Sequence, residues 1–166
     1  MGVELTADEV FDMARQIERD AAGFYRQAAA AVGSPRSREV LQRLAAMEDD
    51  HESLFAAMKS HFSGHQWTPE GLVQAAGEPT AAATMLALGA FVSGAKEDLA
   101  EHITGRESSR DILRRALDFE RDFIVLVAYM QGMVADPLEK ARIDAILKEE
   151  VGHILLLTGE LAMLKS

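Results

Sequence analysis

The chain has 166 residues, a formal net charge of −10 and no cysteine. A chain of this length can bury the core of one domain, so we expect residues 1–166 to form a single domain. The acidic charge and the lack of a basic stripe argue against nucleic acid as a partner. The lack of cysteine excludes disulfides, thiolate metal sites and iron–sulfur clusters.

Two long helices joined by a short break are expected at the start of the chain. The segment Thr6-Ala7-Asp8-Glu9 has the pattern of a capping box, and apolar residues follow at helical spacing as far as Gly33. Ser34 and Pro35 suit the N-cap and the first residue of a second helix, which continues to about Phe62. Such a pair predicts an antiparallel helical hairpin.

Residues 63–108 interrupt the helical pattern, and we expect them to form a crossover between two halves of the fold. Glycine, proline and threonine punctuate the start of this segment, while residues 81–92 could form a short apolar helix and residues 96–103 a short polar one. No apolar run is long enough to span a bilayer, and residues 1–7 lack the pattern of a signal peptide. We therefore expect a cytoplasmic protein with no membrane partner.

The second half of the chain repeats the organisation of the first. Ser108 and Ser109 can open a third helix, and Asp136-Pro137-Leu138-Glu139 supplies a cap, a proline and a glutamate at the start of a fourth. This break follows Ser34-Pro35 by 102 residues (34→136). The sequence therefore predicts an all-α fold, an up-down four-helix bundle made of two hairpins with a long crossover between the second and third helices.

One constellation occurs twice in the chain: a glutamate followed 30 residues later by the pattern Glu-x-x-His. The two copies are Glu18, Glu48 and His51, and Glu120, Glu150 and His153. The same offset of 102 residues relates every member of the first copy to its counterpart (18→120, 48→150, 51→153). In two antiparallel hairpins, all four glutamates would lie at one height, roughly 22 Å from the turns at 1.5 Å per residue.

The neighbours of these glutamates on the same helix faces are mostly apolar, and none is lysine or arginine. A carboxylate buried on such a face is unfavourable unless a positive charge meets it. A single buried Glu or His is as often a satisfied core group as a ligand, so the prediction depends on the complete set. We expect the six residues to bind two metal ions: iron, with manganese or zinc as alternatives, because the donors are oxygen and nitrogen without sulfur.

The remaining titratable residues are expected to lie outside this set. Tyr25 follows Glu18 by two helical turns and is interpreted as a core residue or as a hydroxyl that contacts a ligand. The acidic residues beside the two motifs are expected to face solvent; they are Asp49, Asp50, Glu52 and Glu149. Three histidines have no counterpart at the 102-residue offset and are not expected in the site; they are His61, His65 and His102.

The arrangement resembles the ferritin-like superfamily, in particular the rubrerythrin di-iron domain. The segments that carry the resemblance are Ile17-Glu18 with Phe24-Tyr25, Met47-Glu48-Asp49-Asp50-His51, Ala116-Leu117-Asp118-Phe119-Glu120 and Glu149-Glu150-Val151-Gly152-His153. The resemblance implies a carboxylate-bridged di-iron centre that reduces H2O2 or O2 at the expense of Fe(II). In this hypothesis Glu48 and Glu150 bridge the metals, each histidine supplies one nitrogen, and the other two glutamates are terminal or bridging ligands.

Two departures from typical rubrerythrins shape the expected function. Rubrerythrins carry a rubredoxin-like iron module held by four cysteines, which this chain lacks, so its electrons would come from an external donor. They also have an extra glutamate one turn after the third-helix ligand, where this chain has Phe123, so the ligand set is that of bacterioferritin-like proteins. Ferroxidase or iron-storage activity, and a non-catalytic bundle stabilised by metal, are the alternatives. The apolar residues 81–92 need cover, so we also expect a homodimer.

Overall fold

The structure is a computed structural model that describes residues 7–62, 103–104, 106–134 and 136–164. Within these residues it has four helices and no strand: α1 (Ala7–Ala31), α2 (Pro35–Phe62), α5 (Ser109–Met133) and α6 (Pro137–Met163). The all-α prediction is confirmed. The expected cap at Thr6, the short helix over residues 81–92, nearly all of the segment 96–103, and the residues His65 and His102 lie outside the described part of the chain.

The helices begin where the sequence places their caps. The Ser34 hydroxyl accepts a hydrogen bond from the Ser37 amide at 3.3 Å, directly before the start of α2. At the start of α5, Ser108 and Asp111 form a reciprocal capping box. At the start of α6, the carboxylate of Asp136 accepts hydrogen bonds from the next two free amides, each at 2.9 Å. Local chemistry therefore sets both breaks that are related by the 102-residue offset.

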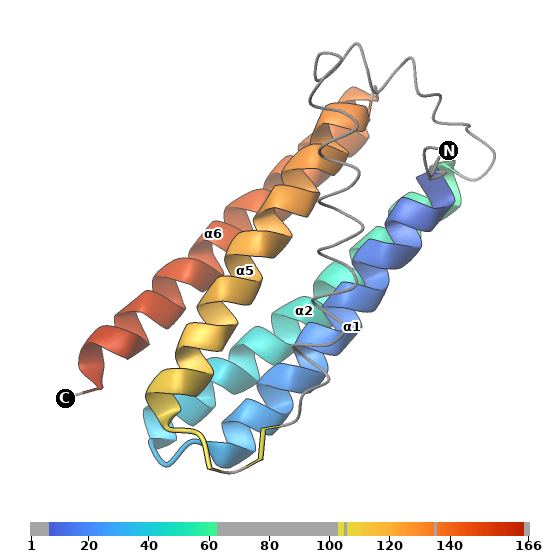
Figure 1. Cartoon of the computed structure of the whole chain (residues 1–166). Helices are drawn as coiled ribbons and strands as arrows, with labels where there is room; N and C mark the ends of the chain where they lie inside the picture. The colour runs from blue at the N-terminus through green and yellow to red at the C-terminus, as the bar shows by residue number, and fades with distance from the viewer. Residues whose placement is uncertain (1–6, 63–102, 105, 135, 165–166) are drawn as a thin grey trace, which may run out of the picture.

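The four helices form two antiparallel hairpins, α1 with α2 and α5 with α6, which pack side by side (Figure 1). Between the hairpins, α1 contacts α5 and α2 contacts α6. The C-terminal end of α2 and the N-terminal end of α5 lie at opposite ends of the bundle (Figure 1). One hairpin is therefore inverted relative to the other, as the repeated sequence pattern predicts. No helix of the described residues is long and apolar enough to cross a membrane.

Apolar side chains at helical spacing fill the space between the hairpins. Phe55 of α2 meets Phe123 of α5 edge to face, with ring centroids 6.4 Å apart. Phe55 also contacts Phe11 of α1, and all three rings are fully buried. Burying one such side chain contributes about 1.5–3 kcal/mol, so this aromatic cluster helps to hold the two hairpins together.

Polar contacts fix the register of α2 against α6 at one end of the bundle. The buried carboxylate of Glu160 on α6 accepts hydrogen bonds from Arg36 Nε at 2.6 Å and from Ser37 Oγ at 3.1 Å. Near this end, Arg110 of α5 donates to the carbonyl oxygen of Leu164 at 2.6 Å. Because the helices are rigid rods, fixing their register at one end also fixes the heights of the residues at mid-bundle.

Candidate metal centre

The six residues predicted to bind metal meet in the middle of the bundle, and each of the four helices supplies at least one. They are Glu18 of α1, Glu48 and His51 of α2, Glu120 of α5, and Glu150 and His153 of α6. Each is at most 3% exposed. The heights set by the two hairpins therefore coincide, and four glutamates and two imidazoles share one buried layer.

Two overlapping groups of these residues could each hold a metal ion, because their ligand atoms lie within 4.8 Å of one another. We name them half-sites. The first half-site is Glu18, Glu48, His51 and Glu150, and the second half-site is Glu48, Glu120, Glu150 and His153. Glu48 and Glu150 belong to both. This sharing places one carboxylate from each hairpin between the two half-sites, where bridging carboxylates lie in two-metal sites.

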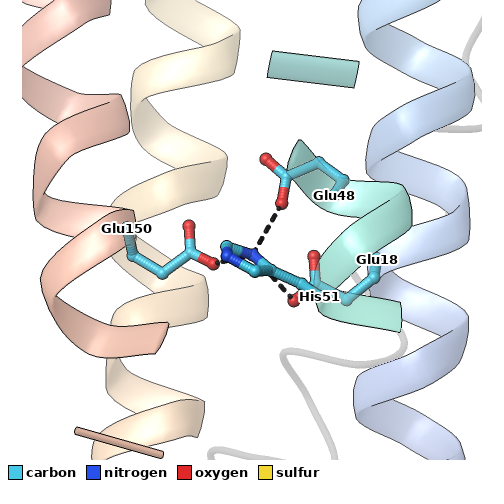
Figure 2. Close-up of side chains that lie close together, drawn as sticks. All are labelled: Glu18, Glu48, His51 and Glu150. Atoms are coloured by element: carbon cyan, nitrogen blue, oxygen red, sulfur yellow. Dashed lines mark hydrogen bonds and ion pairs between the residues drawn. The ribbon is translucent and has the colours of Figure 1, made fainter. Parts of the chain in front are cut away.

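In the first half-site, carboxylates from three helices surround the Nδ1 atom of His51 (Figure 2). The nearest oxygens belong to Glu150 at 2.9 Å, Glu48 at 3.2 Å and Glu18 at 3.6 Å. The other ring nitrogen, Nε2, lies 3.0 Å from Oε2 of Glu149. Glu149 faces solvent as predicted, with its side chain 54% exposed, but its carboxylate also reaches from α6 to His51, a contact that was not predicted.

The second half-site repeats this geometry. Around Nδ1 of His153 lie oxygens of Glu150 at 3.0 Å, Glu48 at 3.1 Å and Glu120 at 3.5 Å. The rings of His51 and His153 are nearly parallel, with an interplanar angle of 22° and centroids 5.5 Å apart. The fully buried Tyr25 donates a hydrogen bond from its hydroxyl to Oε1 of Glu120. Of the two interpretations of Tyr25, the contact with a predicted ligand applies, and the ring is also part of the core.

Many polar atoms in this layer are buried without a hydrogen-bond partner among the described residues. They are both carboxylate oxygens of Glu18 and Glu150, one oxygen each of Glu48 and Glu120, and both ring nitrogens of His153. Buried polar groups are nearly always paired, and each unpaired one costs about 1–3 kcal/mol. The concentration of such atoms at one place makes a cluster that could hold metal ions, and oxygen and nitrogen donors without sulfur fit iron, manganese or zinc.

Burial and mutual repulsion make two of the carboxyl groups hard to ionise. Burial raises the pKa of Glu18 well above its usual range, and the charges of Glu48 and Glu150 raise it further. Burial likewise raises the pKa of Glu120 to about 8, although the nearby imidazole of His153 opposes this shift. Glu150 differs: burial raises its pKa, but its close contacts with both histidines outweigh burial and lower the pKa to about 2.

Both imidazoles favour the protonated state. Burial lowers the pKa of His51, but hydrogen bonds and charges of Glu150 and Glu48 outweigh it and raise the pKa to about 10. Burial also lowers the pKa of His153, whereas Glu120, Glu150 and Glu48 raise it to about 12. At pH 7 both histidines and Glu120 therefore favour the protonated state, and burial shifts the pKa of Glu18 in the same direction. Divalent cations bound in the layer could take the place of such protons.

Two apolar rings close one side of the buried layer. Phe55 and Phe123 follow His51 and Glu120 by about one turn and are fully buried. They keep bulk water away, which strengthens electrostatic interactions in the layer.

Most of the flanking acidic residues lie outside this layer, as predicted. Asp49 and Asp50 are exposed, and Asp49 pairs with Arg26. Glu52 departs in part from the prediction, because it is half-buried and pairs with arginine side chains of α1. The predicted exclusion of His61 agrees with its exposed position near the end of α2.

Two further glutamates of α6 are buried, and their burial was not predicted from the sequence. Glu139 and Glu160 continue the stripe of buried residues on which Glu150 and His153 lie, at spacings of three and four residues. That spacing was the signal that could have revealed their burial. Each has an arginine partner, Arg142 at 2.8 Å for Glu139 and Arg36 at 2.6 Å for Glu160. Because an arginine of the chain balances the charge of each, these two glutamates are not candidates for metal binding.

Comparisons of the chain with protein-family models, with curated proteins and with solved structures give no match. The functional argument is therefore carried by the residues of the buried layer and their geometry.

Proposed function

We propose that this chain is a di-iron oxidoreductase of rubrerythrin type within the ferritin-like superfamily, which reduces H2O2 or O2 with electrons from an external donor. The observation that supports it is the overlap of the two half-sites at Glu48 and Glu150. When bound, the iron pair supplies two reducing equivalents close together, which suits a two-electron reduction. The directions of the helices, with α2 ending and α5 starting at opposite ends, support the ferritin-like assignment (Figure 1).

Each of the six residues has a defined part in this proposal. Glu48 and Glu150 would be shared by the two ions, because each lies within reach of both half-sites. His51 and His153 each present Nδ1 toward the carboxylates. Glu18 and Glu120 complete the two ends of the layer, one in each half-site.

The composition of the layer favours a reactive metal pair over ions that only stabilise the fold. Structural zinc sites are typically closed, with four protein ligands for each ion. Here each ion would have four residues within reach, two of them shared, and iron or manganese can take about six ligands, so positions would remain for a small substrate. The buried phenylalanines limit water access on one side, which suits a site that handles a small oxidant.

Metal content and reaction with oxidant test this proposal. We expect the natively purified chain to hold two iron or manganese ions, and the anaerobic Fe(II)-loaded form to oxidise rapidly when H2O2 is added, as seen by near-ultraviolet absorbance. Glu150→Ala should lose both properties. Glu139→Ala, which removes a buried glutamate near the start of the same helix, should retain them. Metal-free protein whose behaviour is unchanged by chelators would favour the non-catalytic bundle and overturn the proposal.

A second candidate is ferroxidase activity in iron storage or handling. Phe123 supports it, because this fully buried ring occupies the place of the extra glutamate of rubrerythrins and leaves the ligand set of bacterioferritin-like proteins. The two candidates differ in assembly and oxidant. A homodimer that reacts faster with H2O2 than with O2 supports the rubrerythrin type, whereas a large shell that reacts with O2 supports storage. Size-exclusion chromatography and stopped-flow absorbance separate them.

A further inference from the structure

The two half-sites have matching ligands but different surroundings. The 102-residue offset that relates the ligands pairs Glu149 with Met47 (149−102) and Tyr25 with Val127 (25+102). A carboxylate and a hydroxyl therefore each have an apolar counterpart. The six ligand positions obey the repeat, and the residues that contact them do not.

The first difference concerns the histidines. Nδ1 of His51 faces the carboxylates, and Nε2 lies 3.0 Å from Glu149. When Nδ1 binds a cation, the ring proton must be on Nε2, from which it can donate to Glu149. A carboxylate partner of this kind holds the ring in the correct tautomer and orientation and increases the basicity of the ligating nitrogen.

His153 lacks this support. Its Nδ1 also faces the carboxylates, but Nε2 is buried and has no hydrogen-bond partner among the residues that the structure describes. Met47, at the position corresponding to Glu149, offers at most a weakly accepting sulfur. A proton on Nε2 of His153 therefore stays unpaired, which disfavours the tautomer that binds metal.

The second difference concerns the outer glutamates and acts in the same direction. The hydroxyl of Tyr25 donates to Glu120, which takes electron density from that carboxylate and occupies part of its accepting capacity. Val127 has no hydroxyl, and both oxygens of Glu18 are without a hydrogen-bond partner among the described residues. Glu18 is thus the stronger donor to a cation.

We propose that the two half-sites bind divalent metal unequally, that the first half-site fills first, and that Glu149 is the positioning residue that prepares His51 for this step. This inference rests on the proposed metal centre and deepens it. It makes the pair of ions inequivalent, so one can be retained while the other is lost or exchanged.

The test is a titration of the metal-free full chain with Co(II) under anaerobic conditions, followed by visible absorbance and calorimetry. We expect two steps that differ by about 10–100-fold in affinity, the usual effect of a hydrogen-bonded partner on a ligating histidine. Glu149→Ala should weaken the first step by about the same factor and leave the second unchanged, so the steps merge. Glu149→Gln keeps an accepting oxygen and should restore part of the first step.

Two further variants sharpen this test. Asp50→Ala removes an exposed carboxylate beside His51 and controls for the general loss of negative charge, so both steps should be unchanged. Met47→Glu places a carboxylate at the position that corresponds to Glu149 and should strengthen the second step. The ¹⁵N shifts of the imidazoles report the ring tautomers, which a purely structural role of Glu149 would not alter.

Two results would overturn the inference and separate it from the proposed function. Two Co(II) ions bound with equal affinity, or an equal loss of both steps in Glu149→Ala, would refute the inequality while leaving the metal centre intact. No binding of Co(II) by the parent chain would refute both. Circular dichroism of each variant checks that the fold is retained, which we expect for Glu149 because its side chain is half exposed.

Discussion

Buried glutamates occur in two regions of this bundle, at its ends and in its middle. The two regions differ in how the charges of these carboxylates are balanced. At the ends, Glu139 and Glu160 each pair with an arginine of the chain. In the middle, four glutamates lie at one level, and no lysine or arginine is paired with them within the described residues. A carboxylate paired with an arginine has its charge balanced within the chain, whereas the carboxylates of the middle layer are arranged so that they could hold cations from outside.

The largest expected effect comes from removing a ligand shared by both half-sites. Glu150→Ala should abolish binding of both ions, with at least about a 100-fold loss of affinity, because it removes an oxygen donor from each half-site. Metal analysis after dialysis measures this loss. Glu160→Ala, the matched change at the end of the same helix, should retain both ions. Equal loss in the two variants would contradict the distinction between middle and ends.

The second prediction is a steep pH dependence of metal binding. At pH 7 the metal-free layer retains protons on His51, His153 and Glu120, whose pKa values are raised to about 10, 12 and 8. Burial and the charge of Glu48 also raise the pKa of Glu18. Cations must displace these protons, so affinity should rise with pH, by about tenfold per pH unit for each proton displaced.

Calorimetry in buffers of different ionisation enthalpy counts the released protons. We expect several protons to be released when two ions bind, because the pKa values of His51, His153 and Glu120 lie above 7. Binding without proton release would show that the layer does not hold the protons that its burial and charges imply.

The third prediction concerns stability. Each bound ion should stabilise the fold by about 2.7 kcal/mol at 100 times its Kd, because it binds the folded chain and relieves the repulsion in the middle layer. For a chain of this size each ion then raises the Tm by about 5–11 °C. Thermal unfolding with and without a chelator measures it. The Glu150→Ala variant is the control, and its Tm should not respond to the chelator.

The smallest expected effect is at the end of the bundle. Glu160→Ala removes the carboxylate that accepts hydrogen bonds from Arg36 and Ser37. Because Arg36 is 66% exposed, water can replace its lost partner. We therefore expect the free energy of unfolding to fall by only about 1 kcal/mol. Chemical denaturation measures this value. A loss as large as that caused by removing metal would place the main stabilising contact at the end rather than in the middle.

Much of the fold and of the candidate site could be predicted from local rules. The caps at Ser34, Ser108 and Asp136 were identified because N-cap chemistry depends on neighbouring residues only. The meeting of the six residues could be predicted because equal spacing from a turn sets equal height in rigid antiparallel helices. The family assignment and the reaction stay predictions.

The contacts that cross between helices were not predictable in the same way. Glu149 reaches His51 across 98 residues of sequence, and Tyr25 reaches Glu120 across 95. Such pairs depend on side-chain direction and on the packing angle of two helices, which no local pattern encodes. The pairing of Glu160 with Arg36 likewise joins α6 to the start of α2, across 124 residues of sequence.

The sequence by itself therefore determined the four helices, their breaks and the heights of the six residues at mid-bundle, because capping and the rise of a helix are local properties. Only the tertiary structure decided which buried glutamates meet an arginine and which do not. It also decided that Nε2 of His51 faces a carboxylate, whereas Nε2 of His153 has no hydrogen-bond partner among the described residues. The reason is physical: the sequence repeat duplicates the ligand residues, but the side chains that contact each ligand come from other helices. At those positions the two halves of the sequence differ.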